Sequence, residues 1–201
     1  MQSGDIMELT DGTQIRIRPV DGSDRAALVA GFERLSETSR FLRFFTGMHR
    51  LSTSTLDSLT DIDQDRHVAI GVFDPNRPSD VGAADGLGIG VGRYFVDRDD
   101  PTRAEASVAV IDEYHGRGIG TMLLQSLVVV ARERGIETFI MDTLAENTGM
   151  ATVLAKLGAR PILESTEHGQ LRFEVDVPST ADPIKSTAGY RVMRELAKAS
   201  D

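Results

Sequence analysis

Residues 108–121 read Val108-Ala109-Val110-Ile111-Asp112-Glu113-Tyr114-His115-Gly116-Arg117-Gly118-Ile119-Gly120-Thr121. The first part is apolar and β-branched, which is typical of a buried strand, and an amphipathic run over 121–134 predicts a helix after the glycines. A strand, a glycine-rich turn and a helix in this order expose consecutive backbone N–H groups at a helix N-terminus, where the helix dipole also favours an anion. The stretch therefore predicts an anion site, with a plain glycine turn as the alternative.

The glycine spacing narrows the choice of nucleotide. The segment lacks the Gly-Lys-Ser/Thr ending of a nucleoside triphosphate loop and the Gly-x-Gly-x-x-Gly spacing of a dinucleotide fold. Coenzyme A is the remaining good candidate.

Short strands and helices alternate along the rest of the chain, as judged from apolar periodicity, capping residues and turn residues. Strands are predicted near 15–19, 68–73, 87–96, 106–111, 138–144, 161–163 and 171–177. Besides 121–134, helices are predicted after a cap at Ser23 or Asp24, from Ser36, after Ser52, from Asn147, and briefly over 190–198.

Composition limits the class of protein. A chain of 201 residues with 40% hydrophobic and 26% charged residues fits one globular domain. The absence of cysteine excludes disulfides, thiolate zinc sites and a cysteine nucleophile. A net charge of −9 argues against a nucleic-acid partner, and no window resembles a membrane span or a signal peptide. We expect a soluble cytoplasmic protein whose acidic surface suits a cationic acceptor.

The quoted stretch resembles the acetyl-CoA motif of the GNAT superfamily of N-acetyltransferases, Gln/Arg-x-x-Gly-x-Gly/Ala. A second resemblance lies in residues 146–158, where Asn147 and the pair Leu157-Gly158 match the second cofactor motif. The segments 15–19 and 35–45 are similar to the catalytic domain of bacterial Pat-type protein lysine acetyltransferases.

The resemblance implies an α/β (α+β) GNAT fold, with a mixed, mostly antiparallel sheet of about seven strands flanked by four or more helices. It divides the chain into an N-terminal extension (1–12), an acetyltransferase domain (13–177) and a C-terminal tail with a short helix (178–201).

The resemblance also implies acetyl-CoA as cosubstrate and no metal. The strand backbone would bind the pantetheine arm, the amides of the glycine turn would hold the pyrophosphate, and the start of a later helix would add one side chain. The residues concerned are Val108, Ala109, Val110, His115, Gly116, Arg117, Gly118, Ile119, Gly120, Thr121 and Asn147.

Two positions depart from the family pattern. His115 replaces the usual Gln or Arg, which leaves the backbone amides in place and is expected to alter affinity. Leu154 stands where many members have a tyrosine that protonates the leaving thiolate, so that role is left to water or to no group.

An amine with a pKa of about 10.4 needs a base before it can attack a thioester. Glu105 matches the position of the base in Pat-like enzymes, and its alternative role is a surface salt bridge with Arg103 or Arg93. His67 is the second candidate base, although a histidine at the start of an apolar strand is more often structural. The backbone N–H of Val110 would polarise the thioester carbonyl.

The predicted reaction is direct attack of an amine on acetyl-CoA in a ternary complex. The favoured acceptor is a protein lysine, such as one on an acyl-CoA synthetase. A small amine remains an alternative, as does a non-catalytic acyl-CoA-binding regulator. We expect a monomer or a homodimer.

Overall fold

The computed structural model describes residues 5–162 and 169–178, which form one eight-stranded sheet with helices on both faces. The strands lie in the order β1-β2-β3-β4-β5-β6-β8-β7. Their bounds are β1 (Asp5–Glu8), β2 (Gln14–Pro19), β3 (His67–Asp74), β4 (Leu87–Val96), β5 (Arg103–Val110), β6 (Thr138–Leu144), β7 (Arg160–Ile162) and β8 (Gln170–Asp176). The helices are α1 (Arg25–Glu33), α2 (Glu37–Phe44), α3 (Thr53–Thr60), α4 (Ile119–Glu133) and α5 (Thr148–Lys156), with 3₁₀ turns η1 (Gly22–Asp24) and η2 (Asp112–Tyr114).

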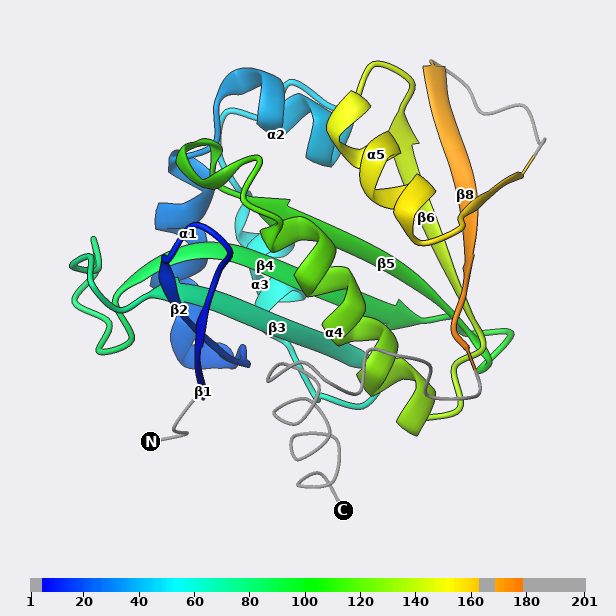
Figure 1. Cartoon of the computed structure of the whole chain (residues 1–201), viewed down its shortest axis with the longest axis horizontal. Helices are drawn as coiled ribbons and strands as arrows, with labels where there is room; N and C mark the ends of the chain where they lie inside the picture. Colours follow the sequence, from blue (N-terminus) through cyan, green and yellow to red (C-terminus); the bar gives the residue numbers. More distant parts are fainter. Residues whose placement is uncertain (1–4, 163–168, 179–201) are drawn as a thin grey trace.

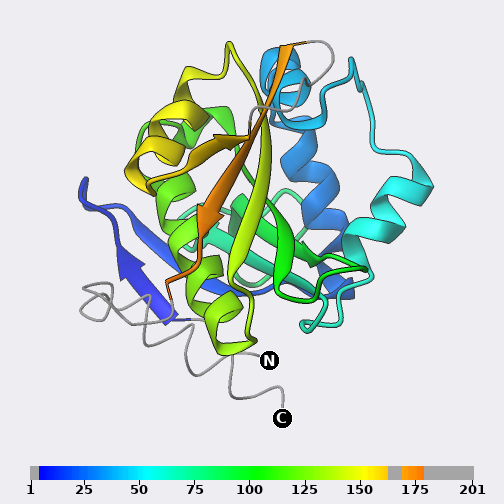
Figure 2. The same cartoon turned by 90° about the vertical axis from the view of Figure 1, so that its right-hand side faces the viewer.

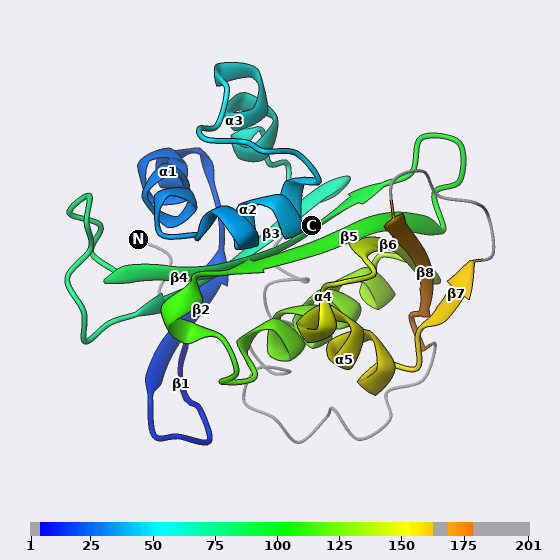
Figure 3. The same ribbon diagram turned by 90° about the horizontal axis from the view of Figure 1, so that it is seen from above.

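The helices form two layers around the sheet. Figure 1 shows α4 crossing one face of the central strands, and Figure 2 shows α4 and α5 on one side of the sheet with α1, α2 and α3 on the other. Seen from above in Figure 3, α1 to α3 gather over one end of their face, while the part formed by β8 and β7 carries no described helix. In the described part of the chain, that end of the sheet is therefore open on one side.

Glycines on β4 let α4 approach the sheet closely. A Cβ added at Gly92 would lie 3.2 Å from Leu123 Cβ, and one at Gly90 would lie 3.4 Å from a methyl carbon of Leu123. Leu123 and Leu127 are fully buried in the resulting contact. Burial of such side chains stabilises the fold by about 1.5 to 3 kcal/mol each, so these glycines contribute by making room for α4.

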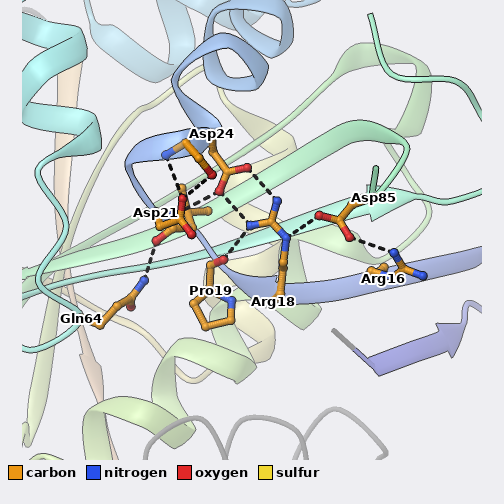
Figure 4. A network of polar contacts seen from close by, with 9 residues as sticks. Arg16, Arg18, Pro19, Asp21, Asp24, Gln64 and Asp85 are labelled. Carbon is orange, nitrogen blue, oxygen red and sulfur yellow. Dashed lines mark hydrogen bonds and ion pairs between the residues drawn. The ribbon is translucent and has the colours of Figure 1, made fainter. Parts of the chain in front are cut away.

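A buried arginine ties β2 to the start of α1 and to the loop before β4. Arg18 donates two hydrogen bonds to Asp24, of 2.7 and 2.8 Å, and one of 2.7 Å to Asp85, which also binds Arg16 (Figure 4). Asp24 is therefore an ion-pair partner. Asp24 occupies the N-cap position of α1, as predicted, although its side chain makes no capping hydrogen bond there. The 3₁₀ turn ahead of α1 is capped by Asp21, which accepts from the N–H of Ser23.

The predicted class of a mostly antiparallel sheet flanked by helices is confirmed. The additional strand is β1, which pairs with β2 inside the segment expected to be an extension. The helices predicted from Ser36, after Ser52 and from Asn147 begin at those caps. β5 begins earlier and α4 begins closer to the glycine turn than predicted. The tail helix at 190–198 lies outside the described residues. No described helix is long and apolar enough to cross a membrane.

Candidate active site

The site begins where two neighbouring strands separate. β5 and β6 are parallel and pair only at Arg103↔Thr138, Ala104↔Phe139 and Glu105↔Ile140. Beyond Glu105 they diverge, and a cavity of about 820 Å³ fills the wedge between them. Its walls come from β5, the glycine turn, the start of α4, β6, the start of α5 and α2.

The glycine turn closes the far end of this cavity. Gly116 and Gly118 have φ of +75° and +83°, which side chains rarely adopt. Gly118 is the N-cap of α4 and offers no capping side chain, so the first amides of this 15-residue helix remain available to an anion. His115, Gly116, Gly118, Ile119, Gly120 and Thr121 all line the cavity.

Arg117 is placed elsewhere. Its guanidinium lies 4.7 Å from the centre of the Tyr114 ring, and it forms a 3.5 Å ion pair with Asp11. Of the predicted turn residues, it alone does not line the cavity. Its contacts hold the turn against the β1–β2 hairpin.

The strand register decides which backbone groups of β5 face the wedge. Hydrogen-bonded and non-hydrogen-bonded pairs alternate along an antiparallel ladder. Ile111 N–H bonds to the carbonyl of Ile89, which places the pair Val91↔Ala109 among the hydrogen-bonded ones. The backbone groups of Ala109 therefore point to β4, while those of Val108 and Val110 point into the wedge. The predicted backbone contacts of this strand are thus reduced to Val108 and Val110.

His115 folds back on this strand. Its Nε2 lies 2.8 Å from the carbonyl oxygen of Val110, so the ring donates a hydrogen bond to one of the wedge-facing groups. Within the described residues, the Val110 N–H has no backbone partner, and the same holds for both backbone groups of Val108. The unusual residue in the motif thus changes the hydrogen bonds that the strand can offer to a ligand.

Asn147 lies at the opposite wall of the cavity. Its side-chain oxygen caps α5 by accepting from Met150 N–H at 3.0 Å, which leaves its NH₂ group for a ligand. The predicted residue thus both starts the helix and faces the cavity.

A second cavity, of about 870 Å³, lies on the open face of the sheet at the other side of Glu105. The two cavities share Glu105 and Asp142. Asp142 is held by two hydrogen bonds from Arg172, of 2.8 and 2.9 Å. Among the described residues, the exposed carboxylate of Glu105 makes no hydrogen bond or contact ion pair. The alternative of a salt bridge with Arg103 or Arg93 is therefore absent here: Arg103 pairs with Glu174 instead.

His67 does not line either of the two cavities that meet at Glu105. It is buried, its Nδ1 lies 2.8 Å from the Asp61 carbonyl oxygen, and its Nε2 faces Arg93 at 3.3 Å. Burial lowers the pKa of His67, with Arg93 acting in the same direction. The ring is thus a neutral, packed group that lines neither cavity.

Two residues of the site were missed by sequence reasoning. Arg43 of α2 donates to Ser107 Oγ at 2.7 Å, next to Glu105, and both side chains line the first cavity. The sequence showed only a predicted helix with arginines among apolar residues. That pattern is equally typical of core packing, so it did not identify Arg43 as a site residue.

The geometry agrees with comparisons to known proteins. The family profile described as an acetyltransferase (GNAT) domain matches residues 14–160. A Pseudomonas aeruginosa acetyltransferase is 28% identical over 155 residues, covering 76% of this chain and 78% of its own. The acetyltransferase Pat of Mycolicibacterium smegmatis is 27% identical over 172 residues, which are 86% of this chain but only 48% of that protein.

Solved structures agree with this assignment. The GNAT domain of S. lividans PAT aligns with a TM-score of 0.75 and 29% identity over 86% of this chain and 96% of that one. A Salmonella typhimurium acetyltransferase with acetyl-CoA shares the fold at a TM-score of 0.62 and 15% identity, over 84% of this chain and 97% of its own. The chain belongs to the GNAT family of acetyltransferases and is an acetyl-CoA-dependent N-acetyltransferase.

Proposed function

We propose that the enzyme transfers the acetyl group to the ε-amine of a protein lysine, with Glu105 as the base. The observation that carries this proposal is the meeting of two cavities at Glu105. Acetyl-CoA occupies the wedge between β5 and β6, and the acceptor enters from the open face. The amine and the thioester then meet at Glu105. Its carboxylate, unlike that of Asp142, has no partner among the described residues.

The cosubstrate is held mainly by backbone groups. The amides at the start of α4 bind the pyrophosphate, and Gly116 and Gly118 keep that turn open. The carbonyl of Val108 and the N–H of Val110 bond the pantetheine arm, and Asn147 adds its NH₂ group. When bound, the thioester supplies an activated acetyl carbon.

Glu105 accepts the proton that the lysine ammonium must lose. The neutral nitrogen attacks the thioester carbon and forms a C–N bond, and the C–S bond then breaks. The second proton, which the nitrogen loses as the amide forms, passes through water to the leaving thiolate. Proton transfer to Glu105 runs directly or through one water. His67 does not compete for this role because it is buried, its Nε2 faces Arg93, and it lies outside both cavities.

The strand offers two N–H donors for the developing oxyanion. Val110 lies five residues from Glu105, which is about 16 Å along a strand, whereas Val108 lies about 10 Å away. Because the base and the donor must serve the same thioester, Val108 is the better placed of the two, and Val110 is left to the pantetheine arm. This changes the assignment expected from the sequence.

The leaving thiolate takes its proton from water. Leu154, at the position where many relatives have a tyrosine, is 1% exposed and does not line the cavity. A thiolate with a pKa of about 8.5 leaves readily near neutral pH, so the reaction does not require an acid at this position.

The open face favours a large acceptor. A lysine side chain on a folded protein can reach Glu105 across the face of β8 and β7, over which no described helix lies (Figure 3). The names of the Pat relatives support the same class, and the acyl-CoA synthetases are the first acceptors to test.

The test measures coenzyme A release from acetyl-CoA with folded bacterial acyl-CoA synthetases and, in parallel, with a panel of small amines. We expect turnover with the proteins and its loss in Glu105→Gln, with coenzyme A binding retained. Glu174→Gln is the control, because it removes a carboxylate from the second cavity, which Glu105 also lines. Preference for small amines would reject the protein acceptor, and full activity of Glu105→Gln would reject the base.

A further inference from the structure

We propose that a third cavity, beside the cosubstrate site, receives the carbon chain of acyl groups longer than acetyl, so that the enzyme also uses short-chain acyl-CoAs such as butyryl-CoA. The inference rests on the proposed placement of the cosubstrate in the wedge between β5 and β6. It does not depend on the nature of the acceptor, because it concerns the acyl donor.

The third cavity has a volume of about 90 Å³ and lies between the sheet and α1. This is the face of the sheet opposite α4 (Figure 2). Its walls come mainly from α1, the end of α2 and the strands β3, β4 and β5. It touches β5 at Ala109, Val110 and Ile111, which belong to the stretch along which the pantetheine arm is placed. The cavity thus lies beside the strand that holds the acyl donor.

The third cavity is continuous with the cosubstrate site. It shares Leu35, Arg43, Ala109 and Val110 with the first cavity, and no described residue with the second. The side chains of Arg43 and Ala109 are half-buried, as expected where a wall borders open space. An occupant of the third cavity therefore enters from the side of the cosubstrate and not from the side of the acceptor.

The chemistry of the walls suits a hydrocarbon chain. Three charged side chains reach the cavity, and each already has a partner. Asp24 binds Arg18, Arg43 donates to Ser107 Oγ, and Arg93 donates to a backbone carbonyl at the end of α3. The other lining residues are apolar or glycine. A polar ligand would find no free side-chain partner among the described residues, whereas an alkyl chain needs none.

Small residues on α1 keep the cavity open. A Cβ added at Gly31 would meet no atom within 4 Å apart from its own helix backbone, and Ala27, one turn earlier, lines the same space. Protein interiors contain few voids larger than a water molecule. This one has room for about three groups of that size, which corresponds to an acyl chain about three carbons longer than acetyl.

The chemical step is the one proposed for the acetyl group. The amine nitrogen forms a C–N bond with the thioester carbon beside Val108, and the C–S bond breaks. One proton of the ammonium passes to Glu105 and the second, through water, to the thiolate. Only the alkyl chain differs, and it leaves the wedge between Ala109 and Arg43 to enter the third cavity.

The experiment measures the binding of acyl-CoAs to the full chain by calorimetry, without an acceptor. The series is acetyl-, propionyl-, butyryl-, hexanoyl- and octanoyl-CoA. We expect affinity to rise from acetyl to butyryl by up to about fourfold for each methylene, which is the value of a fully buried CH₂ group. Octanoyl-CoA is expected to lose this gain, because its chain exceeds the available space.

Two variants change the size of the cavity. Gly31→Leu fills it and is expected to abolish the gain for butyryl-CoA while the affinity for acetyl-CoA stays within about twofold. Ala26→Leu is the control, because Ala26 is an exposed residue of the same helix that does not line the cavity. Leu28→Ala enlarges the cavity and is expected to make hexanoyl-CoA bind several-fold more tightly than it binds the wild type. A misfolded protein would not produce such a gain.

Equal affinities of the wild type for acetyl- and butyryl-CoA, or an undiminished gain in Gly31→Leu, would overturn the proposal. An effect of Gly31→Leu confined to the KM for the acceptor would assign the cavity to the acceptor and overturn it as well. The placement of the cosubstrate is tested separately by Gly118→Ala, which should weaken all the acyl-CoAs alike. Turnover with small amines only would reject the protein acceptor and leave the chain-length dependence of binding as it is.

Discussion

The carboxylate of Asp112 accepts hydrogen bonds from both the backbone N–H and the hydroxyl of Ser36, at 3.0 and 2.7 Å. A third comes from the hydroxyl of Ser39 at 2.9 Å. Asp112 lies in η2, directly before the glycine turn, whereas Ser36 is the N-cap of α2. The turn that faces the cosubstrate is thereby joined to the helix that carries Arg43.

Replacing Asp112 with Asn should loosen this connection. An amide can accept with one oxygen only, and the loss of charge-assisted hydrogen bonds is expected to cost about 1 to 3 kcal/mol of unfolding free energy. We also expect a several-fold higher KM for acetyl-CoA, since Ser36 and Ser39 line its cavity. Urea unfolding and steady-state kinetics measure the two effects.

The neighbouring residue provides the control for this change. Glu113 binds Arg34 and Arg77 through exposed ion pairs, which are worth at most about 1 kcal/mol. Glu113→Gln should therefore leave the KM for acetyl-CoA nearly unchanged. Equal effects of the two substitutions would contradict a specific role of Asp112.

The glycine turn permits a sharper test of the cosubstrate site. An Ala at Gly118 meets no neighbouring atom, but the φ of +83° is strained for any side chain and costs about 1 to 3 kcal/mol. The backbone can relieve this strain only by moving the first amides of α4. We expect Gly118→Ala to weaken coenzyme A binding about tenfold or more in calorimetry, for a loss of about 1.4 kcal/mol per tenfold.

Gly120→Ala is the matched control in the same turn. Gly120 has no positive φ, a Cβ there meets no atom within 4 Å, and helix propensity favours Ala. Retained affinity in Gly120→Ala beside a loss in Gly118→Ala would show that backbone conformation, and not bulk, matters. Similar losses in both would point to steric exclusion of the ligand instead.

Helix caps and tight turns were predictable from the sequence because each depends on residues that are close together in the chain. The caps Ser36, Ser52 and Asn147 and the glycine turn each depend on residues a few positions apart. Contacts across long separations were not predictable: Arg43 meets Ser107 64 residues away, and Arg18 meets Asp85 67 residues away. The sequence alone could not tell whether the backbone groups of Ala109 or those of its neighbours face the cavity. That distinction depends on the register of β4 against β5, which a strand pattern does not contain.

The ion pairs of Arg18 predict a large effect on stability. Removing this side chain leaves the mostly buried carboxylates of Asp24 and Asp85 without their main partner, which typically costs about 3 to 5 kcal/mol. We expect Arg18→Met to lower the urea midpoint strongly. Arg16→Met removes a more exposed partner of the same Asp85 and should cost about 1 kcal/mol or less. A loss in Arg18→Met as small as that in Arg16→Met would contradict the importance of the buried pairs.

His67 predicts a stability change on the acid side of neutrality. Its pKa in the folded protein is lowered from an ordinary value of 6.5, chiefly by burial. Below that value the unfolded chain binds a proton that the folded chain resists, so stability is complete above pH 6.5 and falls as the pH drops toward the folded pKa. Protonation would also remove the Nε2 acceptor that faces Arg93.

We therefore expect the Tm of the wild-type protein to fall as the pH drops below 6.5, and His67→Gln to reduce this slope. Gln keeps a side chain that can accept from Arg93 but does not titrate. Because His67 lies outside both cavities, the same variant should retain kcat at pH 8 within a few-fold of wild type. A loss of turnover as large as that of Glu105→Gln, in a protein that remains folded, would make His67 a candidate base again. It would also contradict the conclusion that burial excludes His67 from catalysis.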